Sequence, residues 1–331
     1  MIELKNDKLY FSFPDLHPDA HCTVSFQRTL RIPDDDKTWP LPPGLGRFPM
    51  VHVDDYAATL PAEWIERGGV AFPMYQSEAM WIAFSGDDYP FAVKIAAGKI
   101  DAVTGNPWSA DLGEHPQNYV VIPTQPWLDG FCVSKGFIRQ FVAMPLGAGY
   151  TTEEQITGQA EYGGLQIQVC PMKAEIYERE IKSRRQNYHE VGMSVRAICE
   201  AAPSMGLAPG GRMRQQIYSD RFGFDVWDRT HSSRCFVHLC NSLVWQSITG
   251  QHPPYPPPTA KSYSKAGLPW FDYYRDDVEA LAGSNRLAEL KSVSQISQTK
   301  GDHALPENEP VSLPGRQIRQ LRKRRLVREM K

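Results

Sequence analysis

The densest group of chemically reactive side chains in this sequence lies between residues 225 and 240. Its members are Asp225, Asp228, His231, Cys235, His238 and Cys240. Carboxylates and imidazoles serve general acid–base catalysis, and a histidine beside a thiol can activate a nucleophile. Asp225, Asp228, His231, Cys235 and His238 are therefore the candidate catalytic residues of an enzyme of unknown class. Joint action requires that these side chains converge in one pocket.

Histidine and cysteine are also the ligands that zinc prefers, so the same group is a candidate metal site. The spacing His231-x3-Cys235-x2-His238-x-Cys240 matches none of the common zinc motifs. Residues 234–239 are predicted to form a strand, on which Cys235 points away from His238 and Cys240. We therefore predict no metal and no cofactor, and the alternative is a strand with buried thiols and one hydrogen-bonded histidine.

A glycine turn offers a second kind of chemistry, the binding of an anion by backbone N–H groups. A predicted strand at 137–144 leads into Gly147 and Gly149, and then into a helix that Thr151 opens and Glu154 completes as a capping box. A helix N-terminus after a glycine turn can cradle an anion, so Gly147 and Gly149 are anion-binding candidates. The lysine of a phosphate loop does not follow, and the alternative is an ordinary strand-to-helix turn.

Arg212 and Arg214 are further anion-binding candidates. They follow Gly210 and Gly211, which predict a turn, and two guanidinium groups beside a flexible backbone suit a carboxylate or phosphate. The alternative is a turn with solvated arginines.

The sequence from residue 316 to 331 is strongly basic. Eight Lys and Arg residues against Glu329 give this segment a net charge of +7, and the remaining 28 basic and 37 acidic residues give −9. We expect Arg322, Lys323, Arg324 and Arg325 to contact an anionic partner, and three classes of partner fit: a protein, a nucleic acid or a lipid surface. No aromatic residue lies in this segment, so contact with nucleic acid would be limited to phosphates.

These groups must be positioned by a mixed fold. The chain contains 8 Trp, 14 Tyr, 14 Phe and 27 Pro among 331 residues, which favours strands and long loops over a helical bundle. Alternation at 165–169 predicts a strand with one apolar and one polar face, and the stripe at 173–186 predicts an amphipathic helix. We predict an α+β fold with mainly antiparallel strands, a few amphipathic helices and a disordered basic C-terminal tail.

Three regions are expected along the chain. Residues 1–282 form the globular body, with an alternative division into two sub-domains that meet near 172–190. Residues 283–315 are polar and read as a linker, and residues 316–331 as the basic tail. Within the body, the prolines of 253–258 predict an extended connector, and the aromatic residues of 268–274 are expected to fold back and bury their rings.

Several classes of protein are disfavoured by the sequence. The first residues lack the basic and apolar pattern of a secretory signal, and no apolar stretch approaches the roughly 18 residues that span a bilayer. Six widely spaced cysteines suit reduced thiols better than a disulfide framework. We therefore expect a cytoplasmic protein.

Residues 140–147, 163–167 and 267–274 resemble segments of a family of uncharacterised, mostly bacterial proteins. The resemblance extends over most of residues 20–280. It implies a folded body with a variable tail, and it implies no activity, cofactor or site residue.

The leading hypothesis is a binding or interaction protein that is not recognisably catalytic. The alternatives are an enzyme that uses the group at 225–240 and a nucleic-acid-associated protein that acts through its tail. A pocket in which those side chains converge would favour the enzyme, whereas an exposed aromatic patch or groove would favour the binding protein.

Overall fold

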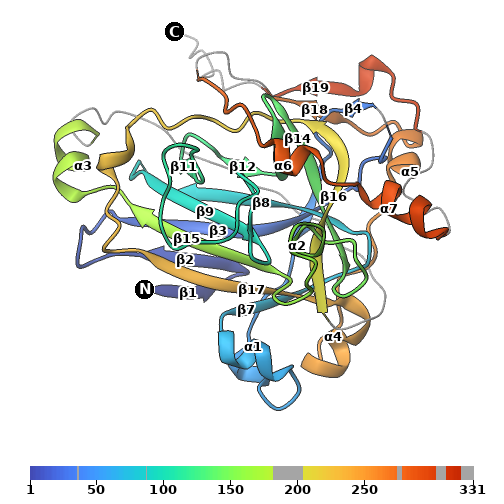
Figure 1. Ribbon diagram of the computed structural model, residues 1–331, viewed down its shortest axis with the longest axis horizontal. Helices are drawn as coiled ribbons and strands as arrows, with labels where there is room; N and C mark the ends of the chain where they lie inside the picture. Colours follow the sequence, from blue (N-terminus) through green and yellow to red (C-terminus); the bar gives the residue numbers. More distant parts are fainter. Residues whose placement is uncertain (36, 87, 182–203, 274–277, 303–310, 322–331) are drawn as a thin grey trace, which may run out of the picture.

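The computed structural model describes residues 1–35, 37–86, 88–181, 204–273, 278–302 and 311–321. Its body is a branched network of 17 hydrogen-bonded strands. Strand β2 pairs with β3, and β15 pairs with β9 and β17; in Figure 1 these five strands run in similar directions, and β14 and β16 cross them steeply. The predicted strand-rich α+β class, with mainly antiparallel pairing, is confirmed.

The strands of the network are β1 (Ile2–Lys5), β2 (Lys8–Ser12), β3 (His21–Thr29), β4 (Thr38–Trp39), β5 (Gly44–Arg47), β6 (Val51–His52), β7 (Val70–Met74), β8 (Ala79–Gly86), β9 (Phe91–Ala97), β10 (Ile100–Asp101), β11 (Val120–Ile122), β12 (Trp127–Leu128), β13 (Gly130–Ser134), β14 (Phe137–Pro145), β15 (Leu165–Pro171), β16 (Ser204–Arg214) and β17 (Ser233–Asn241). Pairs β4–β16 and β7–β17 are parallel. A separate parallel pair joins β18 (Trp270–Asp272) to β19 (Ile318–Gln320).

Short helices surround this network. They are α1 (Ala62–Arg67), α2 (Thr152–Thr157), α3 (Ala174–Glu180), α4 (Ser242–Thr249), α5 (Ala260–Lys265), α6 (Asn285–Ala288) and α7 (Val293–Lys300), with 3-10 turns η1 (Asp54–Tyr56), η3 (Phe224–Val226) and η5 (Gly315–Gln317). Among the residues described, none of these helices is long and apolar enough to cross a membrane.

Strand β15 forms where alternation predicted it, but both of its faces are covered. Gln166 and Gln168 are nearly inaccessible to solvent. Gln166 Nε2 donates to the Gly98 carbonyl at 2.6 Å, and Gln168 Nε2 donates to the Ala110 carbonyl at 2.9 Å. The expected polar surface is thus an internal hydrogen-bonded layer, because loops far away in sequence close over it.

The region expected as a polar linker differs from that expectation between residues 283 and 302. Leu287 of α6 and Val293 of α7 are fully buried, and Ser284 Oγ donates to the Thr104 carbonyl at 2.6 Å. Ser292 caps α7 with a complete capping box. A few apolar residues spaced among polar ones are enough to anchor these short helices on the body.

The aromatic segment after the proline connector folds back as predicted. Trp270 is fully buried, with ring centroids 5.9 Å from Trp39 and 6.3 Å from Tyr263. Its strand β18 then pairs with β19, so residues 318–320, expected within the basic tail, are attached to the body.

The proline connector itself is attached through its backbone. Arg28 and Glu78 form a buried ion pair, with Arg28 Nε 2.7 Å from Glu78 Oε1. Arg28 Nη2 also donates to the Tyr255 carbonyl at 2.8 Å, and the Tyr75 hydroxyl donates to the Pro254 carbonyl at 2.7 Å. The connector is therefore held at two successive carbonyls.

Candidate functional site

The predicted catalytic group is divided between a surface loop and a buried strand. In the loop, His231 Nδ1 lies 2.8 Å from Asp228 Oδ2, and the Asp228 carboxylate also accepts from the backbone N–H groups of Thr230 and His231. Burial raises the pKa of Asp228, but these hydrogen bonds outweigh it and the net pKa is lowered. Asp225 is exposed on η3. Asp228 thus orients His231 in an open loop.

The other two members lie on opposite faces of β17, as predicted. Cys235 belongs to the main core, where burial raises the pKa of its thiol to about 12. His238 stacks on Trp64 with ring centroids 4.6 Å apart, and its Nε2 lies 3.0 Å from the Gly68 carbonyl oxygen. Burial lowers the pKa of His238 to about 4. Cys235 is therefore a protonated thiol and His238 a neutral, internally bonded imidazole at neutral pH.

A metal site does not form from this group. Within the described ranges, no set of three or more His, Cys, Asp and Glu side chains is arranged to hold a metal ion. The convergence in one pocket that the enzyme alternative requires is not found for Cys235, because β17 directs its side chain into the core while Asp228 and His231 lie in the surface loop before the strand.

The predicted anion cradle at Gly147 and Gly149 is filled by the chain itself. Glu154 Oε1 accepts from the Gly149 N–H at 2.7 Å, and Glu154 Oε2 accepts from the Thr151 N–H at 3.1 Å. Thr151 and Glu154 form the predicted capping box. The turn therefore binds a carboxylate, and that carboxylate belongs to its own helix.

Arg212 and Arg214 lie on a strand, although a turn was expected there. A Cβ at Gly210 would stand 2.5 Å from Val142 Cγ2, and one at Gly211 would stand 2.5 Å from the Pro33 carbonyl oxygen. The two glycines are thus required by close packing of neighbouring chain segments rather than by a turn. Strand β16 continues through them and projects both arginines toward solvent.

These arginines do not meet Gly147 and Gly149. The β14–β16 register pairs Phe137 with Arg214 at one end of the ladder and Pro145 with Met205 at the other. Arg212 lies over the Phe137 ring, 4.4 Å from its centroid. The four anion-binding candidates therefore occupy opposite ends of one strand pair.

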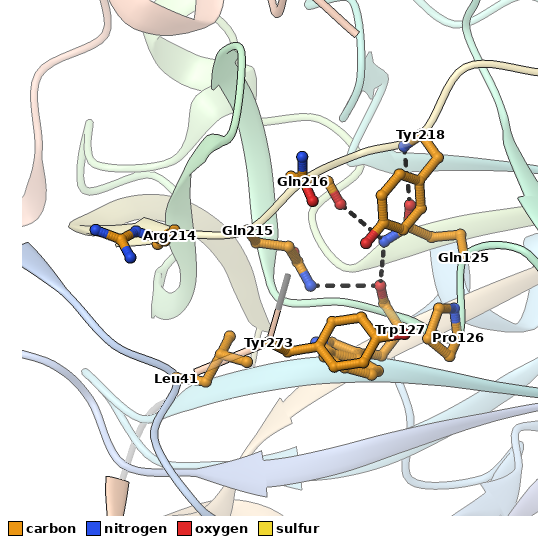
Figure 2. Close-up of a pocket in the computed structure, with 9 residues that line it drawn as sticks. All are labelled: Leu41, Gln125, Pro126, Trp127, Arg214, Gln215, Gln216, Tyr218 and Tyr273. Atoms are coloured by element: carbon orange, nitrogen blue, oxygen red, sulfur yellow. Dashed lines mark hydrogen bonds between the residues drawn. The ribbon is translucent and has the colours of Figure 1, made fainter. Parts of the chain in front are cut away.

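A small hollow opens beside Arg214 (Figure 2). It is lined by Leu41, Gln125, Pro126, Trp127, Arg214, Gln215, Gln216, Tyr218 and Tyr273. The Trp127 carbonyl accepts hydrogen bonds from Gln125 Nε2 at 2.8 Å and from Gln215 Nε2 at 3.4 Å. The centroids of the Trp127 and Tyr273 rings are 4.8 Å apart. The glutamine amides thus hold the walls together, and Arg214 supplies a charge at one side.

Asp272 connects this arginine to the C-terminal segment. Its carboxylate Oδ2 lies 3.6 Å from Arg214 Nη1 and accepts from Gln320 Nε2 at 2.8 Å. Its carbonyl accepts from the Leu321 N–H at 2.8 Å. The residues predicted as tail contacts, Arg322, Lys323, Arg324 and Arg325, lie outside the described residues. They follow directly from this point in the sequence.

We call the exposed arginines of this region the basic end; they are Arg212, Arg214, Arg316 and Arg319. Sequence reasoning identified Arg212 and Arg214 but missed Trp127, Asp272 and Tyr273. A signal was present, because Pro126-Trp127-Leu128-Asp129 and Pro269-Trp270-Phe271-Asp272 are similar tetrapeptides. Both contribute to the surroundings of the hollow.

No protein-family model, curated protein or solved structure matches this chain. The resemblance to an uncharacterised bacterial family therefore stays a prediction.

Proposed function

We propose that this chain is a binding protein, without recognisable catalytic chemistry, that holds an acidic segment of another protein at its basic end. The observation that carries the proposal is the position of Asp272. It contacts both Arg214 of β16 and the last described residues of the C-terminal segment. Two basic features that are distant in the sequence are thereby placed at one surface.

Among the described residues, the charges at this surface are only partly neutralised. The Arg214 side chain is 54% exposed, and its separation of 3.6 Å from Asp272 leaves guanidinium N–H groups for a further partner. Arg316 and Arg319 are exposed on the adjoining segment. A carboxylate-bearing partner would meet several arginines, whose planar donor groups match carboxylates in pairs.

The backbone at the basic end favours an extended partner. Within the described part of the chain, β19 pairs with β18 alone and all three of its residues are exposed. Large apolar side chains are exposed on this strand at Ile318 and next to it at Leu321 and Leu268. An edge strand of this kind can accept another chain by main-chain hydrogen bonds, while alternate side chains supply the specificity.

Binding of a fluorescent peptide of alternating Glu and Val to the full chain tests the proposal. We expect the doubly substituted Arg212→Gln/Arg214→Gln chain to bind roughly two- to thirtyfold more weakly, from exposed charge pairs of about 0.2–1 kcal/mol each. Anisotropy titrations at two salt concentrations measure this change, and higher salt should weaken binding of the unmodified chain.

A matched control removes two cations elsewhere, in Lys5→Gln/Arg179→Gln. Figure 1 shows β1 and α3 far from β18 and β19. This control should bind like the unmodified chain. Equal binding of a Lys–Val peptide, or undiminished binding by the Arg212→Gln/Arg214→Gln chain, would show that the proposed site is wrong.

The catalytic alternative has less support. A nucleophilic enzyme at 225–240 requires an accessible nucleophile beside the Asp228–His231 pair, whereas the thiol of Cys235 lies in the core.

A further inference from the structure

We propose that the outer face of β17 is a binding site for single-stranded nucleic acid. This site is separate from the basic end and does not depend on it. It consists of three rings and three cations, which we call the β17 row: Trp108, Tyr162, Phe236, Arg67, Lys99 and Arg234.

The rings and cations of the β17 row alternate in space. The Arg234 guanidinium lies between two rings, 5.1 Å from the Trp108 centroid and 4.7 Å from the Phe236 centroid. Phe236 and Tyr162 are nearly parallel, with an interplanar angle of 7° and centroids 6.4 Å apart. The Arg67 guanidinium then lies 4.4 Å from the Tyr162 centroid.

The strand pairing builds this arrangement. Arg234 and Phe236 are two residues apart on β17, so they project on the same face. Their partners on β15, Gln168 and Gln166, are buried beneath them. Because Cys235 points into the core between them, the ring and the guanidinium are held at the surface by the register of the sheet.

The β17 row is accessible rather than fully packed. Arg234 is exposed, and the three rings are half-buried. The Trp108 Nε1 has no hydrogen-bond partner among the residues described. Because a shielded indole N–H usually finds such a partner, the described residues leave this polar group of the row unsatisfied.

The charge of the β17 row selects the ligand. Arg67, Lys99 and Arg234 supply three positive charges. One of them, on Lys99, is paired with the Glu161 carboxylate. Proteins that bind single strands without strong sequence preference combine cations that follow the phosphates with rings on which bases stack. An uncharged polysaccharide would use the rings and leave the cations without a role.

Anisotropy titration of the full chain with fluorescent oligo(dT) across a range of salt concentrations tests this site. Tyr162→Leu/Phe236→Leu keeps apolar bulk but removes two stacking surfaces, and we expect about tenfold or more weaker binding with an unchanged salt dependence. Arg67→Gln/Arg234→Gln removes two phosphate contacts, so the slope of log K against log salt should flatten by about 1.4.

Two controls distinguish this site from others. Tyr255→Leu removes an exposed ring that is outside the β17 row, and Arg212→Gln/Arg214→Gln alters the basic end; both should retain oligo(dT) binding. Thermal melting confirms that each variant is folded, and Tyr162→Leu alone serves if the double variant unfolds.

Three results would overturn the inference. The first is absence of oligo(dT) binding, and the second is equal binding by the variants of the β17 row. The third is salt-independent binding of a neutral oligosaccharide at the row in place of oligo(dT). Loss of oligo(dT) binding in Arg212→Gln/Arg214→Gln with retention in the row variants would assign the nucleic acid to the basic end instead.

Discussion

Gln215 holds the Asp129 carboxylate behind the hollow beside Arg214. Gln215 Nε2 donates to Asp129 Oδ2 at 2.6 Å, and the Asp129 N–H donates to Gln215 Oε1 at 2.9 Å. Asp129 is 4% exposed, and burial raises the pKa of its carboxyl to about 7, although hydrogen bonds from Trp127 and Gln215 partly oppose the shift. The acid therefore titrates near neutrality.

This pKa predicts a pH-dependent stability. A carboxyl whose pKa is raised on folding binds its proton more tightly in the folded state. Its contribution is full below the unfolded pKa of about 4 and is lost as the pH rises toward about 7, at roughly 1.4 kcal/mol per unit. We expect Asp129→Asn to lose this dependence, so the stability of this variant relative to the unmodified chain should rise as the pH is raised from about 4 to about 7. Urea unfolding at several pH values measures the free energy of unfolding of both proteins. If this free energy changed with pH in the same way in both, Asp129 would not be the titrating group.

The Arg28–Glu78 pair predicts a large loss of stability when one partner is removed. Both side chains are almost inaccessible, so Arg28→Met leaves the Glu78 carboxylate buried without its cation. Such an uncompensated charge costs about 3–5 kcal/mol. The control is Arg179→Met, which removes an exposed ion pair with Glu180 and should lower the free energy of unfolding by less than about 1 kcal/mol. Chemical denaturation distinguishes the two, and similar losses for both would show that burial does not set the cost.

Leu287 tests whether residues 283–302 belong to the body. Because this side chain is fully buried, Leu287→Ala should lower the free energy of unfolding by about 2–5 kcal/mol. Leu268→Ala, at a position 44% exposed, is the control and should change it by less than about 0.5 kcal/mol. If Leu287→Ala left the free energy of unfolding unchanged, residues 283–302 would be a linker, as the sequence predicted.

The buried thiols predict slow chemical modification of the folded protein. The five described cysteines are free and buried, and burial raises the pKa of Cys132, Cys235 and Cys240 to about 12. The reactive thiolate is therefore scarce and inaccessible. In a Cys199→Ser chain, a thiol reagent should label these residues only on unfolding in denaturant. Rapid labelling of Cys235 under native conditions would instead revive the proposal of a catalytic cysteine.

Local patterns predicted the elements that depend on neighbouring residues. The capping box at Thr151 and Glu154 and the alternation of β15 were readable because the residues that form each pattern are within a few positions of one another. The division of Cys235 and His238 between faces followed from the period of a strand in the same way.

Long-range packing decided what the sequence could not reveal. From the sequence alone, Gly210 and Gly211 resemble a turn. The structure shows instead that these positions lack side chains because Val142 and Pro33 approach them closely. The stack of Trp108, Arg234 and Phe236 joins a loop to a strand more than a hundred residues away. Neither could be inferred from spacing, because the register between strands is not encoded within any one of them.

The attachment of the proline connector bears on how this protein can diverge. Arg28 and Tyr75 bind the carbonyls of Tyr255 and Pro254, and every amino acid carries a carbonyl. The body therefore dictates the path of the connector without dictating which side chains it carries. In related chains, Arg28, Tyr75 and Glu78 should be conserved, while the residue types at positions 254 and 255 should vary. The outer surface can therefore change at these two positions without disturbing the interior.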